Sequence, residues 1–277
     1  MASSVPHIRF SDDVGGDGLG SDAPHPRPTL TDVVARLAEN GFEREVARCV
    51  CICKDARSNA QLWERVVNLL HADAGMGMGG YNFYRTTALI HWAAAGDLVR
   101  VREALVRGAN VNASDSRGWT ALYSATRGGH AAVVRELLDR GAAVDARTHG
   151  GWTPMMGAAF DGNPALIFEL AARGADVNMR DGAGVSPLMR ACWCGHAATA
   201  AELLRFGANV NAQKNGGGRS PLMHAACNGH IDAVRVLLAV PGVDVNLVTA
   251  RGVTALSWAR VYRRDAIVAL LEAAGAR

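Results

Sequence analysis

Three cysteines stand at alternate positions near the start of the chain, at Cys49, Cys51 and Cys53. Because cysteine thiolates bind zinc and react in redox steps, this cluster is the first candidate for chemistry. Structural zinc sites usually need four ligands with Cys-x-x-Cys spacing, and His71 stands alone. On a helix, Cys49 and Cys53 would share a face while Cys51 pointed away. A metal or redox site therefore competes with a buried helix of small side chains.

Other patterns that could serve catalysis are incomplete. The run Gly216-Gly217-Gly218-Arg219 lacks the strand-to-helix context and the Lys-Ser/Thr ending of a phosphate-binding loop. No nucleophile elbow occurs in the sequence. His130, His196 and His230 recur in phase with the repeats described below, which indicates a structural role. We therefore predict a protein that is not an enzyme, with no cofactor and no bound metal.

Composition narrows the class of partner and the compartment. The 277 residues are 49% hydrophobic with a net charge of +3, which favours neither nucleic acid nor a membrane surface as partner. No apolar run approaches the roughly 20 residues that span a bilayer, and no secretory signal pattern opens the chain. We expect reduced thiols, a cytoplasmic or nuclear location and a monomer.

The elements that must position any functional residue come from a repeat. The triplet Thr120-Ala121-Leu122 returns as Thr153-Pro154-Met155, 33 residues later, and further copies follow at steps of 33 or 34. A Gly-Ala step and a following Asn or Asp keep the same phase, as at Gly108 and Asn112. Self-similarity at this period is typical of a solenoid, in which each unit buries its apolar face against its neighbours.

Local physical chemistry predicts the course of each repeat. The Thr or Ser supplies a helix N-cap, and Pro154, Pro187 and Pro221 occupy the first helical position, where a missing N–H costs nothing. A short first helix rich in alanine ends at a glycine, and a second helix follows, as in Val133 to Leu138. A turn-forming segment then leads to the next cap.

These residues resemble the ankyrin repeat family. The resemblance rests on Gly118-Trp119-Thr120-Ala121-Leu122, on Gly151-Trp152-Thr153-Pro154-Met155, and on endings such as Gly108-Ala109-Asn110-Val111-Asn112. It implies an all-α fold, an ankyrin-repeat solenoid of six repeats over residues 81–277. The last repeat departs from the pattern, because Arg263 replaces its glycine.

The residues before the repeats divide into three predicted segments. Residues 1–29 are rich in Gly, Pro, Ser and Asp and are predicted to be a disordered tail. Residues 30–72 carry short apolar segments and are predicted to form a small helical module. Residues 73–80 form a Gly/Met-rich linker.

The predicted helical module contains Val50-Cys51-Ile52-Cys53-Lys54 and, further on, Leu62-Trp63-Glu64-Arg65-Val66. These two runs resemble the second half of an F-box, which docks on the Skp1 adaptor of ubiquitin ligases. The family's opening Leu-Pro is replaced here by Leu30-Thr31-Asp32. The alternative is a helical cap on the first repeat, with Trp63 buried against it. The residues that the resemblance assigns to adaptor docking are Val50, Ile52, Cys53, Leu62 and Trp63.

The ankyrin resemblance places partner binding on the concave face, at the hairpin tips and the exposed side of the first helices. The corresponding tip position stands just before each cap, and the helix positions stand seven and eight residues after it. Tryptophan, tyrosine and arginine there are the residue types that interface hot spots favour. A tryptophan before the cap, such as Trp119 or Trp152, could instead pack on its own hairpin. The candidate partner-binding residues are Trp119, Arg127, Trp152, Phe160, Asp161, Trp193, Arg219 and Tyr262.

Three functions follow from these observations. The leading hypothesis is non-enzymatic protein recognition through the concave face of the stack. The second is a substrate adaptor of a Skp1-cullin ubiquitin ligase, with the repeats choosing the substrate. The third is a metal or redox module built on the cysteine cluster at positions 49–53.

Overall fold

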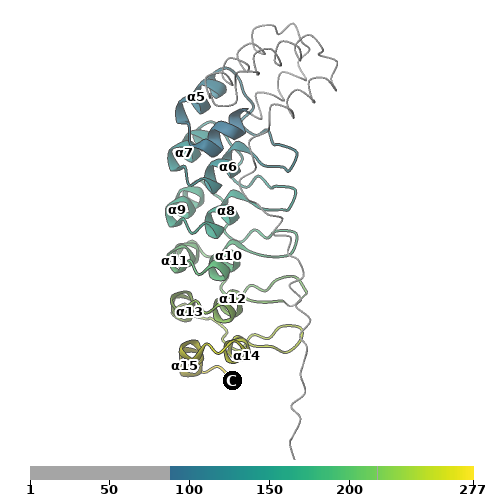
Figure 1. Cartoon of the computed structure of the whole chain (residues 1–277), viewed down its shortest axis with the longest axis vertical. Helices are drawn as coiled ribbons and strands as arrows, with labels where there is room; N and C mark the ends of the chain where they lie inside the picture. The colour runs from purple at the N-terminus through teal and green to yellow at the C-terminus, as the bar shows by residue number, and fades with distance from the viewer. Residues whose placement is uncertain (1–87, 217) are drawn as a thin grey trace, which may run out of the picture. The chain divides into compact units, whose positions relative to one another are not determined.

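The computed structural model describes residues 88–216 and 218–277, and in this part the chain is a stack of helix pairs (Figure 1). Each pair has a first helix and a second helix, and residues 88–95 form the first helix of the first pair. The later first helices are α6 (Ala121–Arg127), α8 (Pro154–Phe160), α10 (Pro187–Cys194), α12 (Pro221–Asn228) and α14 (Ala255–Val261). The second helices are α5 (Leu98–Val106), α7 (Ala131–Asp139), α9 (Pro164–Ala172), α11 (Ala197–Arg205), α13 (Ile231–Leu238) and α15 (Asp265–Ala273).

The arrangement confirms the all-α repeat architecture. The first helices lie in one column beside the projecting hairpins, and the second helices lie in a column on their other side (Figure 1). The sequence predictions for residues 1–29, 30–72 and 73–80 lie outside the described residues. So do the cysteines at positions 49–53 and the five residues assigned to adaptor docking.

The first helices begin at the predicted caps. The Thr120 hydroxyl accepts from the Tyr123 N–H at 3.2 Å, and Ser186 accepts from the Met189 N–H at 3.3 Å. Helices α8, α10 and α12 start with the proline that follows the cap. An oxygen acceptor and a proline at this point satisfy the free end of the helix without loss of a hydrogen bond.

A left-handed residue follows each first helix, and in the last repeat it is not glycine. Gly195 and Gly229 have φ angles of 80° and 84° after α10 and α12, whereas Arg263 has φ 53° after α14. Arg263 is the only non-glycine residue with positive φ in the described part of the chain. Because a Cβ atom crowds the backbone there, this conformation costs about 1–2 kcal/mol.

One apolar core runs through the whole described stack, from Leu89 to Leu271. Alanines on the first helices are fully buried, as at Ala125, Ala158 and Ala191, each with 0% of its surface exposed. Their small side chains allow neighbouring first helices to approach closely, and α10 contacts both α8 and α12. Each repeat therefore completes its core with residues of its neighbours.

Asparagines at the ends of the repeats link each repeat to the next. The Asn178 amide donates to the Gly207 carbonyl at 3.0 Å, and its oxygen accepts from the Asn209 N–H at 2.8 Å. Asn112, Asn211 and Asn246 make the same pair of bonds at the equivalent positions of other repeats. At the equivalent position Asp145 accepts from the Asp176 N–H but has no donor for the next carbonyl.

Histidines at the start of three second helices make a second kind of link. The Nε2 atom of His196 lies 3.0 Å from the Phe160 carbonyl, and that of His230 lies 2.9 Å from the Trp193 carbonyl. A carbonyl only accepts, so each ring donates from Nε2. The rings pack on glycines of the preceding repeat, where a Cβ on Gly195 would lie 2.4 Å from His230 Nδ1. The predicted structural role of these histidines is confirmed.

Asp145→Asn is expected to stabilise the fold, because an amide can accept from Asp176 and also donate to the Gly174 carbonyl. The free energy of unfolding should rise by about 0.5–1 kcal/mol, the net value of one exposed hydrogen bond. Chemical denaturation measures the change. The matched variant Asn178→Asp should lose a similar amount. Equal stability of wild type and both variants would contradict this account of the link.

Candidate protein-binding surface

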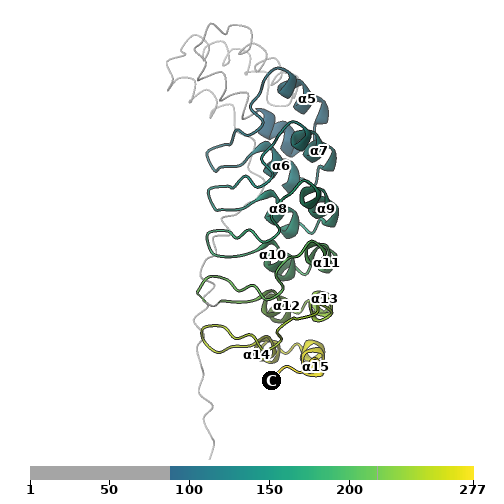
Figure 2. The ribbon, with the colours of Figure 1, turned by 180° about the vertical axis from the view of Figure 1, so that it is seen from behind.

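The predicted partner-binding residues lie on one surface, which we call the inner face. It consists of the hairpins and of the side of the first helices that is not packed against the second helices. Figure 2 shows α6, α8, α10, α12 and α14 with the hairpins beside them. In the described residues each hairpin is closed by a backbone bond, such as the one from the Thr148 N–H to the Trp152 carbonyl at 2.9 Å. In the hairpins that end at Trp119, Trp152, Val185 and Val253, a side-chain oxygen near the start of the hairpin also accepts from the N–H of that last residue. These bonds fix the direction in which the tip side chain leaves the backbone.

The first cluster on the inner face joins two repeats through Arg127 and Asp161. The Arg127 Nε donates to Asp161 Oδ2 at 2.7 Å, and its guanidinium lies 5.2 Å from the centre of the Phe160 ring. Gly157 makes room for this arrangement, because a Cβ there would lie 2.9 Å from Arg127 Cδ. A glycine inside a helix costs about 0.5–1 kcal/mol relative to alanine. Its presence in α8 therefore fits the need to seat the Arg127 side chain.

Both charged groups of this cluster are partly removed from water. Burial raises the pKa of Asp161, and the charge and hydrogen bond of Arg127 offset only part of that rise. Burial opposes the charged form of Arg127, yet its hydrogen bond with Tyr123 and the charge of Asp161 raise its pKa. Electrostatic contacts made here are stronger than contacts made in bulk water, because the surroundings screen charge less.

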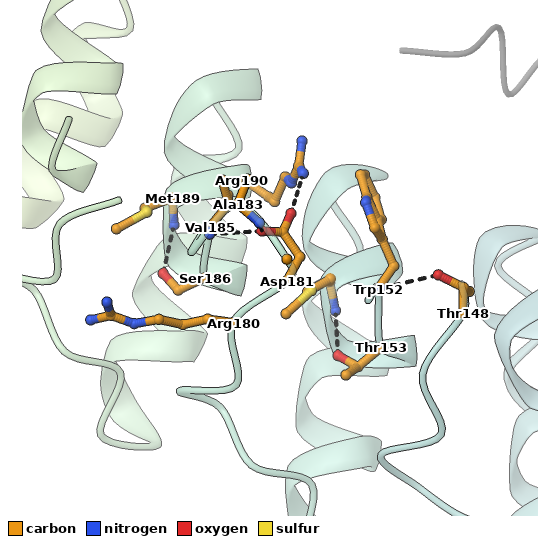
Figure 3. Close-up of polar contacts among 12 residues, drawn as sticks. Thr148, Trp152, Thr153, Arg180, Asp181, Ala183, Val185, Ser186, Met189 and Arg190 are labelled. Carbon is orange, nitrogen blue, oxygen red and sulfur yellow. Dashed lines mark hydrogen bonds and ion pairs between the residues drawn. The ribbon is translucent and has the colours of Figure 1, made fainter. Parts of the chain in front are cut away.

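The second cluster is built around Asp181 (Figure 3). Its Oδ1 accepts from the N–H groups of Ala183 and Val185, both at 2.9 Å, and so closes the hairpin. Its Oδ2 accepts from the guanidinium of Arg190 at 2.7 Å, and that guanidinium lies 4.1 Å from the centre of the Trp152 ring. One buried carboxylate therefore fixes a hairpin and orients an arginine over the tryptophan of the preceding repeat.

Trp193 is the candidate most exposed at the middle of the inner face, with 40% of its surface accessible. The next repeat holds its backbone, because the Asn228 amide donates to its carbonyl at 2.8 Å and His230 bonds the same oxygen. Its ring lies 5.1 Å from the ring of His224. The ring is thus supported from one side and open on the other.

A third cluster joins the last two repeats. The Arg219 guanidinium lies 4.3 Å from the centre of the Trp258 ring, which stacks on Tyr262 at 5.6 Å. Tyr262 is 46% exposed. Like the first two clusters, this third cluster combines an arginine of one repeat with an aromatic ring of a neighbouring repeat.

The structure brings most of the predicted candidates together in these clusters. Trp119 contacts its own repeat, with its ring 4.9 Å from the Tyr123 ring and the Arg117 guanidinium 4.8 Å from its centre. Trp152 instead contacts both Phe160 of its own repeat, at 5.7 Å, and Arg190 of the next. The packing of a tryptophan on its own hairpin therefore describes Trp119 but not the whole environment of Trp152.

Sequence reasoning missed the residues four positions after each cap. These positions hold Gly157, Arg190, His224 and Trp258, and each lies against a candidate residue of the preceding repeat or its own hairpin. The signal was present in the sequence, because the residue at this position varies widely in size and charge from repeat to repeat. Periodicity alone did not show that it faces the surface cluster rather than the core.

The thiols in the described part of the chain are unpaired. Cys192, Cys194 and Cys227 form no disulfide with one another. Burial raises the pKa of all three thiols, which disfavours the reactive thiolate. Within residues 88–277, position 217 aside, no group of three His, Cys, Asp or Glu residues could hold a metal ion.

Comparison with known proteins identifies the family. A profile of the family described as ankyrin repeats (3 copies) matches residues 55–148, 90–181, 141–214 and 188–277. No curated protein matches the chain. Because the matched segments together cover well over half of the sequence, the chain belongs to the ankyrin repeat family. The first match begins at residue 55, upstream of the expected first repeat at 81, and includes Leu62 and Trp63.

Membership has a general functional consequence. Ankyrin repeats act in protein–protein interaction, and they are typically interaction modules rather than enzymes. The described helices are all too short or too polar to cross a bilayer. The fold itself does not select a partner, which depends on the surface.

Asp181→Ala should destabilise the protein by about 2–3 kcal/mol, because it removes two hairpin bonds and leaves the half-buried Arg190 without its partner. Asp181→Asn keeps the acceptor for both N–H groups and should cost only about 1–1.5 kcal/mol. Thermal or chemical denaturation of both variants measures the difference. Identical losses would mean that Asp181 does not close the hairpin in the way described.

Proposed function

We propose that this protein recognises another protein through the inner face, without catalysing a reaction. The site would comprise the candidates Trp119, Arg127, Trp152, Phe160, Asp161, Trp193, Arg219 and Tyr262, with Arg190 and Trp258 added from the clusters. We expect it to act as a monomer in the cytoplasm or the nucleus.

The observation that carries the proposal is the set of arginine–aromatic contacts along this face. Arg127, Arg190 and Arg219 each lie within 5.2 Å of the centre of an aromatic ring, and each contact joins two repeats. Rings and guanidinium groups held in place lose little conformational freedom on binding, and these residue types dominate interface hot spots. A packed core needs none of these side chains at its surface, so a binding role accounts for them.

The proposal predicts that Trp193→Ala weakens partner binding by about 2 kcal/mol, the value typical of a hot spot. Phe168→Ala is the matched control, because Phe168 is 47% exposed on second helix α9 while Trp193 is 40% exposed on first helix α10. Each immobilised variant is incubated with lysate of the producing cells, and retained proteins are quantified by mass spectrometry.

Proteins retained by wild type and by Phe168→Ala but lost from Trp193→Ala are the expected result. Retention that depends on Phe168 and not on Trp193 would place recognition on the second helices and contradict the proposal. Matching melting temperatures of the two variants ensure that the comparison reports binding rather than unfolding.

The adaptor function, with residues 30–70 docking Skp1, stays a prediction from the F-box resemblance of residues 50–66. If it holds, purified full-length protein should bind purified Skp1, and Trp63→Ala together with Leu62→Ala should abolish that binding. Because these residues precede residue 81, the double variant should retain the partners of the inner face. Absence of Skp1 binding by the wild-type chain would remove the adaptor hypothesis and leave the inner-face proposal intact.

A further inference from the structure

The inner face is not uniform in charge along the stack. In its first part, the guanidinium groups of Arg127 and Arg190 are neutralised by Asp161 and Asp181, each at 2.7 Å. In its last part, Arg219 and Arg264 form no ion pair with any carboxylate of the described chain. The nearby Arg260 does have a partner, Glu272 at 2.6 Å. Arg219 and Arg264 therefore lack a counter-charge among the described residues, as does the exposed Arg263 next to Arg264 in the sequence.

Arg219 and Arg264 face the same place, which we call the basic aromatic patch: Arg219, Cys227, Trp258, Tyr262 and Arg264. Arg219 lies over Trp258, and Trp258 stacks on Tyr262. Burial raises the pKa of the Cys227 thiol, while the charges of Arg219 and Arg264 and a hydrogen bond from Tyr262 favour its ionised form. The charges of both guanidinium groups are therefore felt at the same thiol, which belongs to the patch.

Arg264 stands where other repeats carry a histidine. A Cβ on Gly229 would lie 2.9 Å from Arg264 Nε, just as a Cβ on Gly195 would meet the His230 ring. The histidines use this place to bond a carbonyl of the preceding repeat, whereas no such bond is formed by Arg264 in the described structure. The substitution therefore replaces a link within the stack by a permanent charge at the surface.

We propose that the basic aromatic patch binds an acidic peptide segment of the partner, with Asp or Glu carboxylates seated between Arg219 and Arg264 and against Tyr262. Each of the first two clusters consists of an arginine, an aromatic ring and a carboxylate. The third has the arginine and the ring, and the partner supplies the carboxylate. Arg117, Arg147 and Arg180 also have no carboxylate partner among the described residues. Arg147 and Arg180 donate to backbone carbonyls of the next repeat, and Arg117 lies alone over Trp119, whereas the patch presents two guanidinium groups.

This inference rests on the proposed function, since it specifies the chemistry of the partner on the same face. Guanidinium groups bind carboxylates through paired hydrogen bonds, which gives geometric selection as well as attraction. The exposed ring of Tyr262 adds apolar contact area next to the charges. A segment with acidic residues beside an apolar or aromatic one fits both features.

The test selects peptides from a displayed library of random sequences on the immobilised full-length chain. The pH is kept above the ordinary pKa of histidine, so that a histidine introduced into the patch is neutral. The selected peptides are then measured by fluorescence anisotropy against the variant Arg219→Gln/Arg264→His. His130, His196 and His230 occupy the equivalent position in other repeats, so a histidine at position 264 should keep the packing on Gly229. The control Arg135→Gln/Arg235→Gln removes the same charge from exposed second-helix positions on α7 and α13.

The expected result is enrichment of Asp and Glu in the selected peptides, with affinity lowered about tenfold or more by the patch variant and unchanged by the control. Selected peptides without acidic residues that depend on Trp193 would overturn this inference and leave the proposed function standing. Peptides that depend on neither the patch nor Trp193 would overturn both. Equal binding of a single-stranded oligonucleotide of matched charge would also overturn it, because the patch would then be a general polyanion site.

Discussion

No repeat of this protein can bury its own apolar face, and the rest of the structure depends on this constraint. The core is continuous from Leu89 to Leu271 because neighbouring first helices pack against one another along the series from α6 to α14. Apolar packing alone would leave neighbouring repeats free to slide past one another, because the small side chains of the buried alanines interlock very little. The asparagine and histidine links from one repeat to backbone carbonyls of another fix the register.

The fixed register between repeats determines which side chains of neighbouring repeats meet on the inner face. Since neighbours always meet in the same way, the residue four positions after a cap lies close to residues that the preceding repeat presents. A glycine there seats Arg127, an arginine covers Trp152, and a tryptophan supports Arg219. Each surface cluster is therefore shared by two repeats. Changes at this one position alter the binding face while the buried alanines and leucines stay the same.

The fold was accessible from the sequence because its determinants are local and repeated. The caps, the prolines after them and the period near 33 each predict the same helix boundaries, and the structure agrees with them.

The candidate surface could be predicted from the sequence only in part. Positions seven and eight after each cap led to Arg127, Asp161 and Trp193, but Arg190 and Trp258 were missed because periodicity does not show that position four after a cap meets side chains of the preceding repeat. Such contacts depend on the stacking geometry, which spacing within one repeat does not reveal. The predictions for residues 1–80, including the cysteine cluster and the F-box resemblance, lie outside the described residues.

The central claim is that recognition takes place on the inner face, and amide hydrogen exchange of the full-length chain tests it most directly. Exchange is measured with and without a captured partner, and peptides covering each helix and hairpin are compared. The account predicts slower exchange in the hairpins and in the first helices α8, α10, α12 and α14, with α7, α9, α11 and α13 unchanged. Protection confined to the second helices, with the hairpins unaffected, would contradict it.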